Sequence, residues 1–252
     1  MTCNIPTEAE IPQLVSLWKD VFGEFGDFWE DFLRTGFSRQ RCLCLMENEE
    51  ILAALTWIDC TLGNQKLAYL YAVLTRPDHQ GRGLCRQLMT QTHAYLKNQG
   101  YTAALLVPAD GGLRQMYGTM GYRNCAGIQE FSCQAGDGPV PLSPLTEAEF
   151  SRKRRELLPP GSVVQEGAGL DFLATQESFW SGEDFLLADH IRDDSLKAVE
   201  LLGNISAAPG ILKALGCKTG TFRCPGNMQQ PAMYHPLTPN AEMPQYFAFD
   251  FD

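Results

Sequence analysis

The N-terminal part of the chain changes from helix-like spacing of apolar residues to short, almost continuous apolar runs. Two stretches, 10–22 and 27–37, repeat apolar residues at helical spacing, which predicts two amphipathic helices. Apolar runs follow at 41–47, 51–62 and 66–75, separated by the polar segments "NEE" and "GNQ", as is typical of a strand hairpin followed by a third strand. The third run shows no alternation, so we expect it to be buried on both faces of a sheet.

Between residues 84 and 133, helix-like and strand-like patterns alternate along the chain. Residues 84–98 place their leucines on one face of a predicted helix, and 101–107 is another apolar strand. Since a strand, helix, strand order implies a parallel pair with a right-handed crossover, we expect 66–75 and 101–107 to be parallel neighbours. Residues 111–122 predict a short helix or turn, and 123–133 predict one more strand.

Glycine, proline and serine dominate residues 134–145, which predicts a linker between two domains, 1–133 and 146–252. The second half again mixes helix and strand patterns, so the fold class is α/β (α+β) throughout. Helices are expected at 146–158 and 206–216. Strands are expected at 170–174, 184–190, 195–203, 219–224, 231–237 and 245–251.

Composition narrows the functional classes. With 252 residues, 44% hydrophobic and 20% charged, the chain resembles an ordinary globular protein. It has neither an apolar run of about 20 residues nor a signal peptide pattern, so we expect a cytoplasmic protein with no membrane partner. The net charge of -10 argues against a nucleic-acid partner, and we interpret the basic segment 151–155 as a solvated helix face.

Cysteine and histidine positions give no support to a metal site. The nine cysteines form no CxxC pair, and the four histidines are far apart in the sequence. We therefore expect no metal cofactor, and we expect the cysteines to behave as small buried hydrophobic residues.

The segment "HQGRGLC" at 79–85 places two glycines between a buried strand and a helix. A helix start usually carries Ser, Thr, Asp or Asn, so this turn has a purpose other than capping. Glycines allow a phosphate to approach the unpaired amides of a helix N-terminus, and Arg82 or Arg86 can add a charge-assisted bond. These residues predict a phosphate-bearing ligand, and a simple phosphate-binding module stays open as one interpretation.

Two segments carry a resemblance to a known family. "QGRGLC", after a strand ending in "AVLTRPD", resembles the pyrophosphate motif of the GNAT superfamily of N-acetyltransferases; Gln80 and Gly83 match, and Cys85 stands where glycine or alanine is usual. "GGLRQMYGTMGY" resembles the fourth helix of that family. The pair is similar to the enhanced intracellular survival type, and the second half is similar to the degenerate GNAT-like domain of tandem members.

The resemblance implies acetyl-CoA as co-substrate, held along the strand at Val73, Leu74 and Thr75, with an oxyanion donor near Leu74. It implies that the strands 66–75 and 101–107 splay apart to admit the pantetheine arm. It implies that the pyrophosphate lies on the backbone amides of Gln80, Gly81, Arg82, Gly83, Leu84 and Cys85.

Tyr117 stands at the family's tyrosine position and is the candidate acid that protonates the departing thiolate. Its alternative interpretation is a packing tyrosine. Residues 66–75 contain no Asp or Glu, which leaves Asp59, Glu130, a water relay or the C-terminal carboxylate of Asp252 as the base.

By resemblance, residues 23–32 border the acceptor pocket. Phe28 and Phe32 have core spacing, while Glu24, Asp27 and Trp29 are candidates to face a cationic amine. The leading hypothesis is an N-acetyltransferase that acts on a small, cationic primary amine. The alternative is a non-catalytic acyl-CoA binding or sensing protein, and a homo-oligomer is left open.

Overall fold

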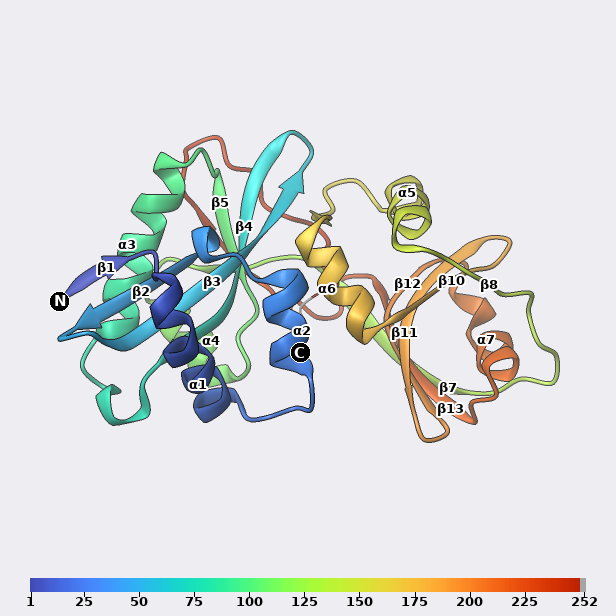
Figure 1. The fold of residues 1–252 in the computed structure, drawn as a ribbon. Coiled ribbons are helices and arrows are strands. Elements are labelled where there is room, and N and C mark those ends of the chain that lie inside the picture. The colour runs from blue at the N-terminus through green and yellow to red at the C-terminus, as the bar shows by residue number, and fades with distance from the viewer. Residues whose placement is uncertain (250–252) are drawn as a thin grey trace.

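The computed structural model describes residues 1–249 and contains two lobes that lie side by side, each built on one mixed sheet (Figure 1). The first sheet has eight strands in the order β1-β2-β3-β4-β5-β14-β6, with β9 paired to β3 outside this order. Its strands are β1 (Thr2–Asn4), β2 (Cys42–Glu47), β3 (Glu50–Leu62), β4 (Gln65–Thr75), β5 (Ala103–Leu106), β6 (Arg123–Asn124), β9 (Val164–Gln165) and β14 (Met233–Pro236).

Helices cover both faces of the first sheet. They are α1 (Ile11–Phe22), α2 (Phe28–Asp31) with the π-helical turn Phe32–Gly36, α3 (Leu84–Asn98) and α4 (Gly111–Gly118). Leu14 and Trp18 of α1 belong to the core on one face, and Leu88 of α3 belongs to the core on the other. The predicted helices are confirmed, and β4 contributes buried residues to both cores, as its uninterrupted apolar run predicted.

The second sheet has six strands in the order β7-β13-β12-β11-β10-β8. They are β7 (Ile128–Gln134), β8 (Ser143–Pro144), β10 (Ser178–Ser181), β11 (Phe185–Arg192), β12 (Ser195–Gly203) and β13 (Thr219–Pro225). Its helices are α5 (Glu147–Leu157), α6 (Ala168–Gln176) and α7 (Ala208–Leu215). β12 and β13 are parallel and α7 joins them, whereas the other pairs are antiparallel. The mixed α/β class predicted for both halves is confirmed.

Two strands lie in the sheet opposite to the one expected. β7 was expected to belong to the first domain, but it pairs with β13 in the second sheet. β14 comes from the C-terminal half, yet it lies between β5 and β6 of the first sheet. The sheets therefore do not follow the expected division into 1–133 and 146–252, because strand pairing depends on long-range contacts that a local pattern does not contain.

Residues 134–145 do not form a free linker. They run from β7 at one edge of the second sheet to β8 at the other edge and pass over α7. The amide of Gly136 donates to the Pro209 carbonyl at 2.9 Å, and the amide of Val140 donates to the Gly210 carbonyl at 3.3 Å. The segment is therefore packed against the start of α7.

Two further expectations are wrong, and both concern the region between the lobes. Residues 170–174 lie in helix α6 and not in a strand, since so short a segment, with four apolar residues, does not distinguish the two elements. α6 sits between the sheets, where Phe172 packs on Phe32 at 5.0 Å between ring centroids (Figure 1). Residues 245–249 are also not a strand; there, Phe247 packs on Tyr69 of β4 at 5.0 Å.

The basic segment 151–155 is only partly a solvated face. Arg154 is buried, and its guanidinium donates to both carboxylate oxygens of Glu200, at 2.6 and 2.9 Å. The cysteines are free thiols in buried or half-buried positions, as expected. Within residues 1–249 there is no group of three or more side chains placed to hold a metal ion. None of the described helices has the length and apolar character needed to cross a membrane.

Candidate functional site

The site begins where β4 and β5 separate. Their parallel pairing covers only Leu67–Tyr69 on β4, so the second half of β4 has no partner on that side. On its other side, β4 carries a bulge: Ala72 and Val73 lie opposite the single residue Leu55 of β3, and Ala72 has a φ of +48°. A bulge interrupts the ladder and leaves backbone groups unpaired. The expected splay is thus present, and backbone donors are available just before Leu74.

The glycine turn follows β4 and is exposed to solvent. Gly81 and Gly83 have φ values of +73° and +77°, and a Cβ atom on either would find nothing within 4 Å. Leu84 begins helix α3, and its side chain is buried while the turn before it is open. Among residues 1–249, no backbone hydrogen bond is recorded for the amides of 81–83. Such a turn at a helix N-terminus has the form of an anion site.

Three arginines surround the turn, and they differ in their contacts. Arg76 pairs with Glu50 at 3.1 Å and with Asp78 at 2.9 Å, which braces the entry to the turn. Arg86 donates two hydrogen bonds to Thr119 beyond α4. Arg82 is exposed on the turn itself, so of the two candidates for a phosphate contact it is the better placed.

Tyr117 lies on α4, which Asp110 caps by accepting a bond from the Leu113 amide at 2.7 Å. Its ring is buried and joins the core that contains Leu84 and Leu88 of α3, with Cys85 packed against it. Tyrosine is protonated at neutral pH even at its ordinary pKa, and burial raises the pKa of Tyr117 further, which makes its phenol a weaker acid than that of free tyrosine. The position of this protonated phenol beside the helix of the glycine turn is what suits a general acid.

Burial also raises the pKa of the Cys85 thiol. The thiolate is the nucleophilic form of cysteine, so this shift disfavours a nucleophile at the turn. Cys85 is therefore a half-buried packing residue at a motif position that favours small side chains.

A histidine cluster behind Tyr117 was not predicted from the sequence. The Tyr122 ring lies 5.7 Å from the Tyr117 ring, and its hydroxyl is 2.8 Å from Nε2 of His93. His235 of β14 stacks on His93 at 4.2 Å. Burial lowers the pKa of His93 to about 3 and also lowers that of His235, so both rings are neutral. Only the insertion of β14 brings them together, and no local pattern signals it.

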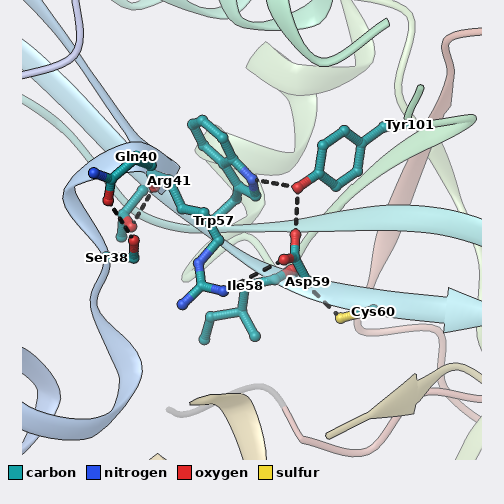
Figure 2. A network of polar contacts seen from close by, with 9 residues as sticks. Ser38, Gln40, Arg41, Trp57, Ile58, Asp59, Cys60 and Tyr101 are labelled. Atoms are coloured by element: carbon teal, nitrogen blue, oxygen red, sulfur yellow. Dashed lines mark hydrogen bonds and ion pairs between the residues drawn. The ribbon is translucent and has the colours of Figure 1, made fainter. Parts of the chain in front are cut away.

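Asp59 is engaged away from the bulge. Figure 2 shows its carboxylate between the Tyr101 hydroxyl, which donates to it, and the Arg41 guanidinium at 3.3 Å. Asp59 pairs with Ala68, four residues of strand or about 13 Å from Ala72. The network continues to Trp57, whose indole N–H donates to the Tyr101 hydroxyl at 2.9 Å. These contacts hold the side chains of neighbouring strands together.

The other two candidate bases lie elsewhere. Glu130 is on β7 in the second sheet, where its carboxylate faces Arg223 at 3.9 Å. Asp252 lies outside the described residues. Of the four candidates, a water relay and the C-terminal carboxylate of Asp252 are therefore the two that the described residues do not place elsewhere.

The acceptor candidates are dispersed. Trp29 is 2% exposed and donates its indole N–H to the Gly23 carbonyl at 2.8 Å, so it is a core residue and does not face a pocket. Glu24 and Asp27 are exposed on the α1–α2 connection. Phe32 is buried and Phe28 half-buried, as their spacing predicted.

Comparison with known families identifies the first lobe. Residues 4–125 match the family described as "Acetyltransferase (GNAT) domain". This part of the chain is similar to GNAT acetyltransferase domains. The match spans the bulge, the glycine turn and Tyr117, so the resemblance carried by the two motifs is confirmed. A comparison with curated proteins gives no match.

Solved structures extend the likeness of fold to both lobes. A GCN5-related N-acetyltransferase from Kribbella flavida has a TM-score of 0.71 at 18% identity, covering 94% of this chain and 72% of that one. One from Anabaena variabilis has a TM-score of 0.72 at 15% identity, covering 94% and 73%. Eis1 from Mycobacterium abscessus has a TM-score of 0.68 at 10% identity, covering 94% and 73%. At these identities the shared property is the fold.

Proposed function

We propose that this protein transfers the acetyl group of acetyl-CoA directly to the primary amine of a small cationic acceptor. The observation that carries the proposal is the combination, within a GNAT domain, of the β4 bulge at Ala72 with the open turn at Gly81–Gly83. The turn would bind the pyrophosphate, and the unpaired half of β4 would bind the pantetheine arm through its backbone.

Acetyl transfer needs a donor to the carbonyl oxygen, a proton for the leaving thiolate and a neutral amine. The bulge backbone near Leu74 would donate to the carbonyl oxygen as the amine attacks. Tyr117, which carries its proton at neutral pH, would give that proton to the sulfur. Because Asp59 and Glu130 are engaged elsewhere, the proton of the attacking amine would leave through water or to the C-terminal carboxylate of Asp252.

The direct test measures release of free thiol from acetyl-CoA in the presence of polyamines, aminoglycosides and amino acids. We expect one cationic amine to be acetylated, with the product confirmed by its mass. Isothermal titration with acetyl-CoA accompanies the assay. Failure of acetyl-CoA to bind would overturn the proposal altogether.

A second candidate function, acyl-CoA sensing without catalysis, is favoured by the absence of a carboxylate base near the bulge among the candidates that lie in residues 1–249. Binding of acetyl-CoA with no acetylated product from any amine would support the sensor.

A further inference from the structure

We infer that Arg86 is a positioning residue that links the glycine turn to helix α4, so that cofactor binding at the turn holds Tyr117 in place. The inference rests on the proposed function, because it assumes that coenzyme A occupies the turn. It adds a residue that touches neither the acetyl group nor the acceptor.

The link is made by two hydrogen bonds from one guanidinium to one residue. Nη2 of Arg86 donates to the Thr119 hydroxyl at 2.7 Å, and Nη1 donates to the Thr119 carbonyl at 3.3 Å. Arg86 lies in the first turn of α3, three residues after Gly83. Thr119 is the C-cap of α4, two residues after Tyr117. A side chain at the cofactor turn thus reaches the end of the helix that carries the candidate acid.

Thr119 is prepared to receive this contact. Its hydroxyl donates to the Met116 carbonyl at 2.7 Å, which leaves the oxygen lone pairs free to accept from Arg86. The positive guanidinium lies at the C-terminal end of α4, where the helix dipole favours a cation. With eight residues, α4 is short, and a helix of that length depends on contacts beyond its own backbone.

The position of Arg86 makes the link responsive to the cofactor. An anion bound to the amides of 81–85 would fix the first turn of α3, and Arg86 would transmit that order to α4. A second contact, from His93 to Tyr122, starts two helical turns further along α3 and holds the segment after α4 whether or not the turn is occupied.

The test is hydrogen exchange of the full chain with and without coenzyme A, comparing segments 81–90 and 111–122. Thr119→Val removes the hydroxyl but keeps the shape of the side chain. Thr175→Val is the matched control, because Thr175 in α6 also donates to a carbonyl three residues earlier, Phe172 at 2.8 Å, and also accepts from a neighbour, Gln176.

In the wild type and in Thr175→Val, we expect coenzyme A to slow exchange in both segments. In Thr119→Val, segment 81–90 should still be slowed, while the slowing in 111–122 should shrink about fivefold, the effect of one such bond. Unchanged slowing of 111–122 in Thr119→Val overturns the inference alone. No slowing of 81–90 in the wild type overturns the proposed cofactor site itself.

Turnover gives a second readout with the amine that the thiol assay identifies. Thr119→Val should lower kcat about tenfold, because misplacement of a reacting group is costly, with little change in KM for acetyl-CoA. Thr119→Ser should restore kcat, since it restores the hydroxyl. In a Tyr117→Phe background the Thr119→Val change should have no further effect. Wild-type kcat in Thr119→Val, with Tyr117→Phe impaired, contradicts the inference and leaves the proposed function intact.

Discussion

The two lobes share a strand, helix and parallel strand unit, but they treat the start of that helix in opposite ways. Before α3 of the first lobe, glycines create space, since a Cβ on Gly83 would meet nothing within 4 Å. At the start of α7, a glycine permits close packing, since a Cβ on Gly210 would lie 2.6 Å from Cγ1 of Val140. The two lobes therefore share this topology but not the open space at the helix start, and it is this space that the proposed anion site requires.

Each lobe also has a strand bulge, and the surroundings of the two bulges differ. β12 has a register shift opposite Ala188 and Asp189, comparable to the one on β4. Beside it, Glu200 accepts from Arg154 and from the Tyr246 hydroxyl at 3.0 Å, and all three side chains are buried. A buried ion pair therefore lies beside the bulge of the second lobe, whereas the bulge of the first lobe lies in the proposed site.

Removal of one hydroxyl from each lobe should separate chemistry from packing most clearly. Tyr117→Phe should lower kcat by about 10² to 10⁴, the usual contribution of general acid catalysis, with little change in KM for acetyl-CoA. Tyr246→Phe, which removes a buried hydroxyl from the second lobe, should leave kcat near the wild-type value. Near-full turnover of a folded Tyr117→Phe protein would show that Tyr117 is a packing residue.

The ion pair of the second lobe should dominate its stability. Glu200→Ala leaves the Arg154 charge buried without its partner, so the free energy of unfolding should fall by about 3–5 kcal/mol, measured by urea denaturation. Asp194→Ala, which breaks the exposed pair with Lys218, is the control and should change it by less than about 1 kcal/mol. Equal effects of the two substitutions would contradict the contrast.

Gly83→Val tests the open turn. A side chain at a φ of +77° is strained, and it fills the space that the phosphates need, so the Kd for coenzyme A should rise about 10- to 100-fold by calorimetry. Gly100→Val is the control. It shares the backbone strain, since Gly100 has a φ of +80° and open space around it, but it lies at the far end of α3 from the turn. Normal affinity in Gly83→Val would refute the site. If the Gly83→Val protein still bound one equivalent of coenzyme A tightly, the binding site would lie elsewhere. The contrast between the two helix starts would then have no functional meaning.

The neutral histidines of the first lobe should make it sensitive to acid. Burial lowers the pKa of His93 to about 3 in the folded state, against 6.5 as its ordinary value. The unfolded state therefore gains a proton first, and stability falls as the pH drops below 6.5, by about 2 kcal/mol at pH 5. His93→Gln should flatten this slope in urea denaturation between pH 6.5 and 5. An unchanged slope would show that other groups cause the acid sensitivity.

The sequence predicted those parts of the site that lie in short contiguous motifs. The turn at 81–83 and Tyr117 on α4 stand where their motifs implied, and β4 was expected in the middle of a sheet because its apolar run does not alternate. The bulge at Ala72 was not predicted, since its sequence is that of an ordinary strand. Its conformation depends on the register of β4 against β3.

Long-range contacts account for the other misses. Arg154 carries the same charge as its exposed neighbours, and only Glu200, on a strand 46 residues later, explains its burial. The exposed Thr119 and Arg86 have no pattern of their own and become informative only as a pair. The helix at 168–176 was missed because the four apolar residues among its five central residues fit either period.

The position of β14 constrains the order in which the protein forms. When only residues 1–133 have been synthesised, β5 can pair with β4 but not with β14. The reason is that β14 follows almost the whole second lobe in the sequence. Until residues 233–236 emerge, that edge presents unpaired amides and carbonyls, which invite association between nascent chains. We expect fragments that stop at residue 133 to aggregate, and we expect closure of the first sheet to be a late, slow event that long loop closure delays.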